Sequence, residues 1–135
     1  MSVGVLLVTH GRMGDELIAV ARSLLGRDLP LPTRAISMPN DCDNGAALAE
    51  AQRCIDELDS GDGVLVLTDL YGATPSNICG RVGSLAGHLR RVSGLNLPML
   101  IRVQNYPDQA LAELADTAFA GGRNGIVITA AADTP

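Results

Sequence analysis

Short runs of consecutive apolar residues alternate along this chain with segments in which apolar residues recur every three or four positions. The runs are typical of strands buried on both faces, and the recurrence is typical of helices with one buried face. Strands are predicted at Val3–Thr9, Thr33–Met38, Gly63–Thr68, Arg90–Ser93 and Gly125–Thr129. Helices are predicted at Asp15–Leu25, Asn44–Leu58, Pro75–Ala86, Pro98–Gln104 and Asp108–Phe119.

This alternation predicts an α/β protein with three layers: a doubly wound, mainly parallel sheet covered by helices on both faces. Short connections and right-handed crossovers favour the strand order 2-1-3-4, with the fifth strand following the glycine pair Gly121-Gly122. No repeat or linker interrupts the 135 residues, so we expect a single domain over residues 1–135.

Charge and composition exclude several classes of function. The chain has 10 basic and 15 acidic residues, a net charge of −5, and every basic residue is an arginine. Without lysine there is no Schiff-base or P-loop chemistry. The acidic balance and an aromatic content of 2% make nucleic acid an unexpected partner. Residues 41–69 carry eight acids and one arginine, which we interpret as a solvated helix face in preference to an acidic docking patch.

The cysteines and the N-terminus indicate a cytoplasmic chain. Cys42, Cys54 and Cys79 show no metal-binding spacing, so neither a metal nor another cofactor is expected, and their odd number fits a reducing compartment. The opening MSVGVLLVTHGR lacks the features of a signal peptide, and no apolar stretch is long enough to cross a membrane.

A histidine and an aspartate follow two of the predicted strands. His10 ends the first strand and Asp69 follows the third. In the order 2-1-3-4 these strands are neighbours, and ligands of doubly wound sheets bind beyond such strand ends. A carboxylate that accepts from one ring N–H fixes the tautomer, and the other nitrogen then serves as nucleophile or base. We therefore predict His10 and Asp69 as the reactive pair; which nitrogen reacts stays open.

The loop after Asp69 is a candidate phosphate-binding turn. Gly72, Ala73 and Thr74 lead into the helix at Pro75, with Thr74 as its N-cap. Unpaired N–H groups at a helix N-terminus attract phosphoryl oxygens. Arg12 either opposes the added negative charge or is a surface residue, and the sequence leaves the two alternatives equal.

The remaining candidates rank lower. His88 is interpreted as an exposed turn residue, and Tyr71 and Tyr106 as packing or rim residues. Cys79 is interpreted as a small buried side chain. Met38-Pro39-Asn40, at the end of the second strand, could form a wall of the pocket.

Three motifs resemble a known family. VLLVTHGRMGDEL, LTDLYGATPSN and VSGLNLPMLIR are similar, in order and spacing, to enzyme IIA of the mannose type from the bacterial phosphoenolpyruvate-dependent sugar phosphotransferase system (PTS). The resemblance implies that His10 takes a phosphoryl group from the phosphohistidine of HPr and passes it to a IIB component. It implies that Asp69 orients His10 and that Gly72–Thr74 hold the phosphoryl oxygens. It further implies a homodimer that exchanges an antiparallel last strand, and association with a membrane permease complex.

Two departures from the family keep alternatives open. Ala73 stands where the family usually has a second glycine, and the sequence ends at residue 135 without a IIB domain. A solitary IIA is expected to serve either sugar transport with a separate IIB or a regulatory phosphorelay. A class II type metal chelatase, which also opens with a strand ending in His-Gly, is a further alternative; it would need His88 to face His10.

Overall fold

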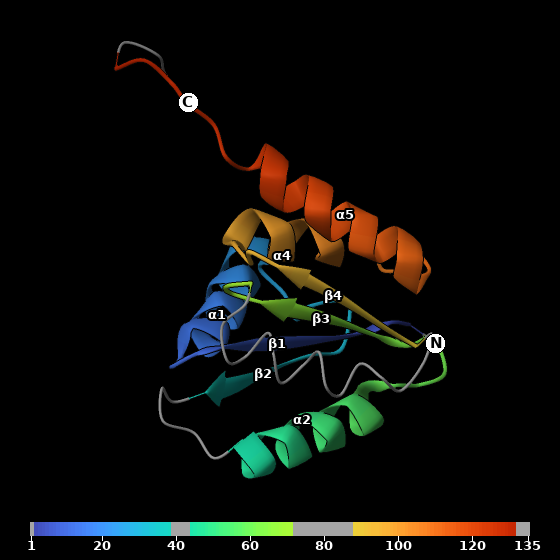
Figure 1. The fold of residues 1–135 in the computed structure, drawn as a ribbon. Helices are drawn as coiled ribbons and strands as arrows, with labels where there is room; N and C mark the ends of the chain where they lie inside the picture. The colour runs from blue at the N-terminus through green and yellow to red at the C-terminus, as the bar shows by residue number, and fades with distance from the viewer. Residues whose placement is uncertain (1, 39–43, 72–87, 132–135) are drawn as a thin grey trace.

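Four parallel strands form the sheet of this protein. The computed structural model describes residues 2–38, 44–71 and 88–131. The strands are β1 (Gly4–His10), β2 (Thr33–Met38), β3 (Val64–Thr68) and β4 (Leu89–Ser93). All three pairings are parallel and the order is β2-β1-β3-β4, so the predicted order 2-1-3-4 is confirmed (Figure 1).

Helices cover both faces of this sheet. They are α1 (Met13–Leu25), α2 (Asn44–Leu58), α4 (Leu97–Gln104) and α5 (Leu111–Asn124). Of the described helices, Figure 1 shows only α2 below the sheet, with α1, α4 and α5 above it. The structure therefore has the predicted three layers, and the predicted helix Pro75–Ala86 lies outside the described residues.

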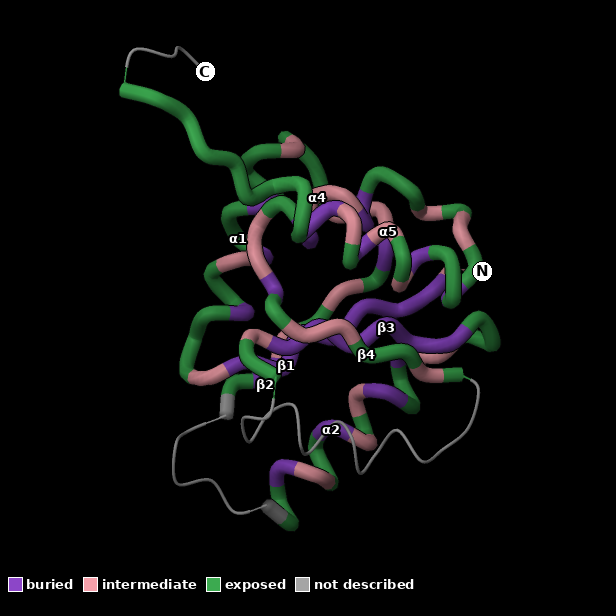
Figure 2. Tube along the Cα trace, turned by 45° about the horizontal axis from the view of Figure 1, so that its top comes forward, coloured by how far each residue is buried: buried purple, intermediate pink, exposed green. Residues whose placement is uncertain are grey.

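Successive residues of the central strands face opposite layers. Leu6 and Val8 of β1 pack with Val64 and Val66 of β3 in the core between the sheet and α2. Their neighbours in sequence pack in the larger core beneath the other three helices, formed at the sheet by Val5, Leu7, Leu65 and Leu67. Because both faces are covered, neither central strand needs a polar face, which explains its continuous apolar sequence. Figure 2 shows these strands buried along their length.

The register brings the carboxyl ends of the strands to one edge. Val8 of β1 is paired with Thr68 of β3, and His10 with Met38 of β2. The strand that follows β1 in the chain, β2, lies on one side of the β1–β3 pair, and the strand that follows β3, β4, lies on the other side, so the strand order reverses between β1 and β3 and this edge is the switch point of the sheet. His10 and Asp69 are thus delivered to the place where such folds bind ligands.

The C-terminal part differs from the prediction. Gly121 and Gly122 do not precede a strand but lie inside α5. A Cβ at Gly121 would stand 2.5 Å from Arg102 Cβ, and one at Gly122 would stand 2.7 Å from Met99 Cε. The two glycines therefore allow α5 to approach α4 closely. The sequence pattern alone does not distinguish such packing glycines from glycines that end a helix.

The predicted fifth strand, Gly125–Thr129, is not formed within the single chain. Residues 126–130 belong to no helix or strand, and they extend away from the sheet (Figure 1). Ile126, Val127 and Ile128 are 75%, 72% and 97% exposed. A strand forms only beside another strand, so the exchanged strand stays a prediction about two chains.

Candidate functional site

His10 and Asp69 meet as predicted, although they are far apart in sequence. His10 is the last residue of β1, and Asp69 directly follows β3. The ring Nδ1 of His10 lies 2.9 Å from Asp69 Oδ2, and the backbone N–H of His10 donates to the same oxygen, also at 2.9 Å. One carboxylate oxygen thus holds both the main chain and the ring of His10.

This geometry assigns the tautomer of the neutral ring. An ionised carboxylate can only accept hydrogen bonds, so Nδ1 carries the proton that Asp69 Oδ2 accepts. Nε2 then holds the lone pair. The His10 side chain is 34% exposed and that of Asp69 is 9% exposed. The structure therefore places a largely buried carboxylate on Nδ1 of a partly exposed ring, which favours Nε2 as the reactive nitrogen where the sequence leaves the choice open.

Opposing effects act on the Asp69 carboxyl. Burial raises its pKa, because its Oδ1 is buried and has no hydrogen-bond partner among the described residues. The backbone hydrogen bond from His10, its ring hydrogen bond and its electrostatic attraction lower the pKa and together outweigh the burial. The pKa of Asp69 consequently lies below its usual value, and the carboxyl is ionised at neutral pH.

The turn after β1 brings an exposed cation close in sequence to His10. Gly11 has a φ of 53°, a left-handed conformation that glycine adopts without strain, and α1 begins two residues later. Arg12 is 81% exposed, with its guanidinium 3.8 Å from Glu16 on the same helix. Arg12 therefore occupies a surface position, one of the two alternatives that the sequence left open.

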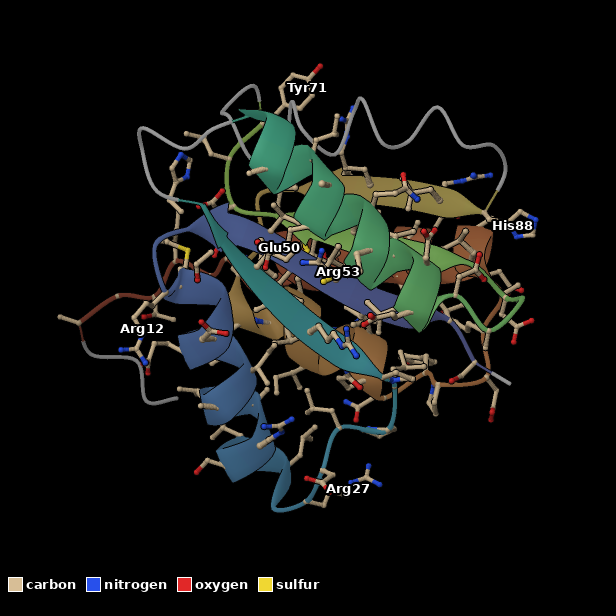
Figure 3. All side chains as sticks on the ribbon, turned by 90° about the horizontal axis from the view of Figure 1, so that it is seen from below. Arg12, Arg27, Glu50, Arg53, Tyr71 and His88 are labelled. Atoms are coloured by element: carbon tan, nitrogen blue, oxygen red, sulfur yellow. The ribbon has the colours of Figure 1, made fainter. Side chains whose placement is uncertain are left out.

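Exposed apolar side chains follow both strand ends. Met13 at the start of α1 is 48% exposed, and Leu70 and Tyr71 after Asp69 are 61% and 78% exposed. Figure 3 shows Tyr71 projecting outward from the molecule. Large apolar side chains exposed to water are typical of a surface that another protein covers.

The structure places other predicted residues elsewhere. His88 precedes β4, where its carbonyl accepts from Val64 N–H at the start of β3. Figure 3 shows it at the opposite end of the sheet from Arg12. His88 cannot join His10 in a metal site, which removes the geometry that the chelatase alternative requires. In the described ranges, no three His, Cys, Asp or Glu side chains gather to hold a metal ion.

Several predicted positions lie outside the described residues: Gly72, Ala73, Thr74, Pro75, Cys42, Cys79, Pro39 and Asn40. The phosphate-binding turn accordingly stays a prediction. The remaining cysteine, Cys54, is a free thiol on α2. Tyr106 is 45% exposed in the segment between α4 and α5, consistent with a rim residue.

Two threonines beside the pair were missed by the sequence reasoning. Thr9 and Thr68 are fully buried, and each directly precedes one member of the His10–Asp69 pair. The available signal was a hydroxyl within an otherwise apolar strand, since a buried hydroxyl needs a hydrogen-bond partner.

The fold and site together define a parallel α/β protein with one oriented, accessible histidine at its switch point. The chain matches, over residues 4–119, the family described as "PTS system fructose IIA component". It therefore belongs to the mannose-type enzyme IIA family of the phosphotransferase system.

Relatives with established names agree with this assignment. The chain is 29% identical over 129 residues to the PTS system mannose-specific EIIAB component of Escherichia coli (strain K12). The match covers 93% of this chain and 39% of that protein, so the chain spans about two-fifths of the relative's length.

Solved structures show the same architecture. The mannose/sorbose specific IIA subunit from Enterococcus faecalis superposes with a TM-score of 0.86 at 27% identity, covering all of both chains. The EIIA component from Streptococcus agalactiae gives a TM-score of 0.80 at 24% identity over 93% of this chain and 96% of that one, a likeness of fold. Among the described residues, no helix is long and apolar enough to cross a membrane.

Proposed function

We propose that this protein is a phosphoryl carrier in which His10 Nε2 takes a phosphoryl group from the phosphohistidine of HPr and passes it to a IIB component. The observation that carries the proposal is the contact of 2.9 Å between His10 Nδ1 and Asp69 Oδ2. It favours the proton on Nδ1 and leaves the lone pair of Nε2 for attack. Membership of the mannose-type IIA family supports the same role.

The transfer step balances without a cofactor. The Nε2 lone pair of His10 forms a bond to phosphorus while the bond from phosphorus to the donor imidazole breaks, and its electron pair returns to the donor nitrogen. The product ring at His10 carries a partial positive charge, which the Asp69 carboxylate stabilises through the Nδ1–H hydrogen bond. Transfer to IIB is the same exchange with His10 as the leaving group, so positioned groups are all that the chain must supply.

The surroundings of His10 support protein partners. A phosphoryl group that moves between two proteins requires their surfaces to close around it, and Met13, Leu70 and Tyr71 offer apolar contact near His10. We assign Gly72, Ala73 and Thr74 to the phosphoryl oxygens, a role that rests on the family resemblance. In a sugar transporter the chain would act in the cytoplasm, docked through IIB to a membrane permease complex.

Incubation with radiolabelled phospho-HPr tests the carrier role. Wild-type protein should gain an acid-labile, base-stable label, and His10→Ala should gain none. The matched control is His88→Ala, which removes the other histidine at the far end of the sheet and should label normally. Asp69→Asn should slow labelling by about a hundredfold or more, because the amide no longer enforces the tautomer. Labelling that persists in His10→Ala would refute the assignment.

Transport and a regulatory phosphorelay make different predictions for the next step. For transport, the labelled protein should lose its phosphoryl group to a purified IIB, and the group should reach a sugar in vesicles that contain the permease. For a regulatory relay, a partner should bind the phosphorylated and unmodified forms with different affinity and no sugar should be labelled. We favour transport, because the relatives that share the family are named as mannose or mannose/sorbose components.

A further inference from the structure

A buried threonine stands immediately before each member of the reactive pair. Thr9 precedes His10 and Thr68 precedes Asp69, and both threonines are 0% exposed. A valine would fill the same space without burying an oxygen. A buried hydroxyl is costly unless it is hydrogen bonded. The advantage of threonine over valine at these positions is therefore the hydrogen bond that each hydroxyl makes.

The Thr9 hydroxyl closes the turn that carries His10. Its Oγ1 accepts the backbone N–H of Gly14 at 2.9 Å in a buried hydrogen bond. The N-cap residue of α1, Arg12, makes no side-chain capping bond. Thr9 therefore satisfies a first-turn N–H of α1 from across the loop. A Cβ at Gly14 would come within 3.2 Å of this oxygen, so the strand end and the helix start are in close contact.

The Thr68 hydroxyl ties the end of β3 to β4. Its Oγ1 donates to Ser93 Oγ at 2.8 Å. The carbonyl oxygen of Thr68 accepts from the N–H of Leu95 at 2.9 Å. Asp69 thus follows a residue whose side chain is bonded to β4 and whose carbonyl is bonded to the segment just after β4.

We propose that Thr9 and Thr68 are positioning residues, whose hydroxyl hydrogen bonds fix the two strand ends so that Asp69 Oδ2 keeps its hold on the His10 ring. The backbone N–H and the ring Nδ1 of His10 both contact Asp69 Oδ2 at 2.9 Å. A small shift of either strand end relative to the other would therefore lengthen these hydrogen bonds. The consequence for phosphoryl transfer rests on the proposed function. The consequence for the ring does not, since ring orientation exists whether or not the protein is phosphorylated.

Isosteric substitutions test this role. Thr9→Val and Thr68→Val remove each hydroxyl and keep the shape of the side chain. The matched control is Thr33→Val at the beginning of β2, whose hydroxyl donates to the Leu31 carbonyl and accepts from Gln104. Thr33 is paired with Val5, so it lies at the other end of the sheet from His10. The control therefore measures the general effect of losing a hydrogen-bonded hydroxyl from a strand.

Three measurements are made on each folded variant: the single-turnover rate of labelling by phospho-HPr, the midpoint of thermal unfolding, and the ring ¹⁵N shifts of His10. Thr9→Val and Thr68→Val should label about tenfold or more slowly than the control, since small misplacement of a reacting group is costly. Their ring shifts should show a reduced fraction of the tautomer protonated at Nδ1. Thr9→Ser, which keeps the hydroxyl, should restore both rate and ring signal.

Ring shifts and labelling rates equal to those of Thr33→Val in both valine variants would overturn the proposal. If Thr68→Val fails to fold, Ser93→Ala removes the acceptor from a partly exposed position and carries the same expectation. The two proposals fail separately: an unlabelled wild type refutes the carrier role, whereas unaltered ring signals in the variants refute the positioning role.

Discussion

At the scale of single residues, the sequence predicts that His10 and Asp69 lie together. It does not predict the hydrogen bonds of Thr9 and Thr68 beside them. Both residues end apolar runs, and neighbouring parallel strands deliver such ends to one edge, so their meeting was predictable. The roles of Thr9 and Thr68 depend on which backbone and side-chain groups lie within hydrogen-bonding distance of each hydroxyl. That information arises only when α1 and β4 are packed in place.

The lowered pKa of Asp69 predicts how stability depends on pH. A carboxyl whose pKa is lower in the folded protein contributes stability above its unfolded value of 3.8, and the contribution is lost as pH falls through the folded value. The free energy of unfolding of the wild type should therefore decline below about pH 5 more steeply than that of Asp69→Asn.

Urea unfolding followed by circular dichroism between pH 7 and pH 3 measures this difference. A wild type and an Asp69→Asn variant whose stabilities remain parallel down to pH 3 would contradict the lowered pKa. Asp56→Asn is the matched control: this carboxyl is exposed on α2, where it accepts from Gln52.

At the scale of elements, packing decided the features that periodicity left unresolved. The strands and the described helices were predicted to within a few residues, because apolar runs and helical spacing report burial directly. Gly121-Gly122 was interpreted as a boundary, since glycine often ends helices. In α5 these two glycines instead leave space for Met99 and Arg102 of α4. The sequence of α5 alone cannot show which helix will pack against it there.

A buried glutamine joins α4 to the segment before β2. Gln104 is fully buried; its Oε1 accepts from Leu31 N–H and its Nε2 donates to Thr33 Oγ1, both at 2.9 Å. Gln104→Leu keeps the approximate volume but leaves the Leu31 N–H without this partner. The free energy of unfolding should fall by about 2 kcal/mol, the cost of a buried unsatisfied group.

Urea unfolding at neutral pH measures the effect. Gln52→Leu on the outer surface of α2 serves as the control and should change stability by less than about 0.5 kcal/mol. The labelling rate of folded Gln104→Leu should match the wild type, because Gln104 lies near the start of β2 and His10 near the other end. A loss of stability no greater than that of Gln52→Leu would show that the buried network contributes little.

At the scale of the whole molecule, the C-terminal segment is the part that one chain cannot explain. The apolar pattern of Gly125–Thr129 is that of a buried strand, yet Ile126, Val127 and Ile128 are exposed in the monomer. Sheet edges and exposed apolar segments are complementary surfaces. The family resemblance implies a homodimer that exchanges its last strand. We therefore propose that this segment pairs with β4, the edge strand of the described sheet, in a second copy of the chain.

Charge placed in the segment should dissociate that dimer. Wild-type protein should sediment at twice the mass of one chain, and the double variant Ile126→Asp, Ile128→Asp should shift towards the monomer, because burial of each isoleucine is worth about 2 kcal/mol and a buried unpaired carboxylate costs more. Leu24→Asp on α1, 64% exposed, applies the same kind of change elsewhere and should leave the mass unchanged. A monomeric wild type, or a double variant that remains dimeric, would exclude exchange of the last strand.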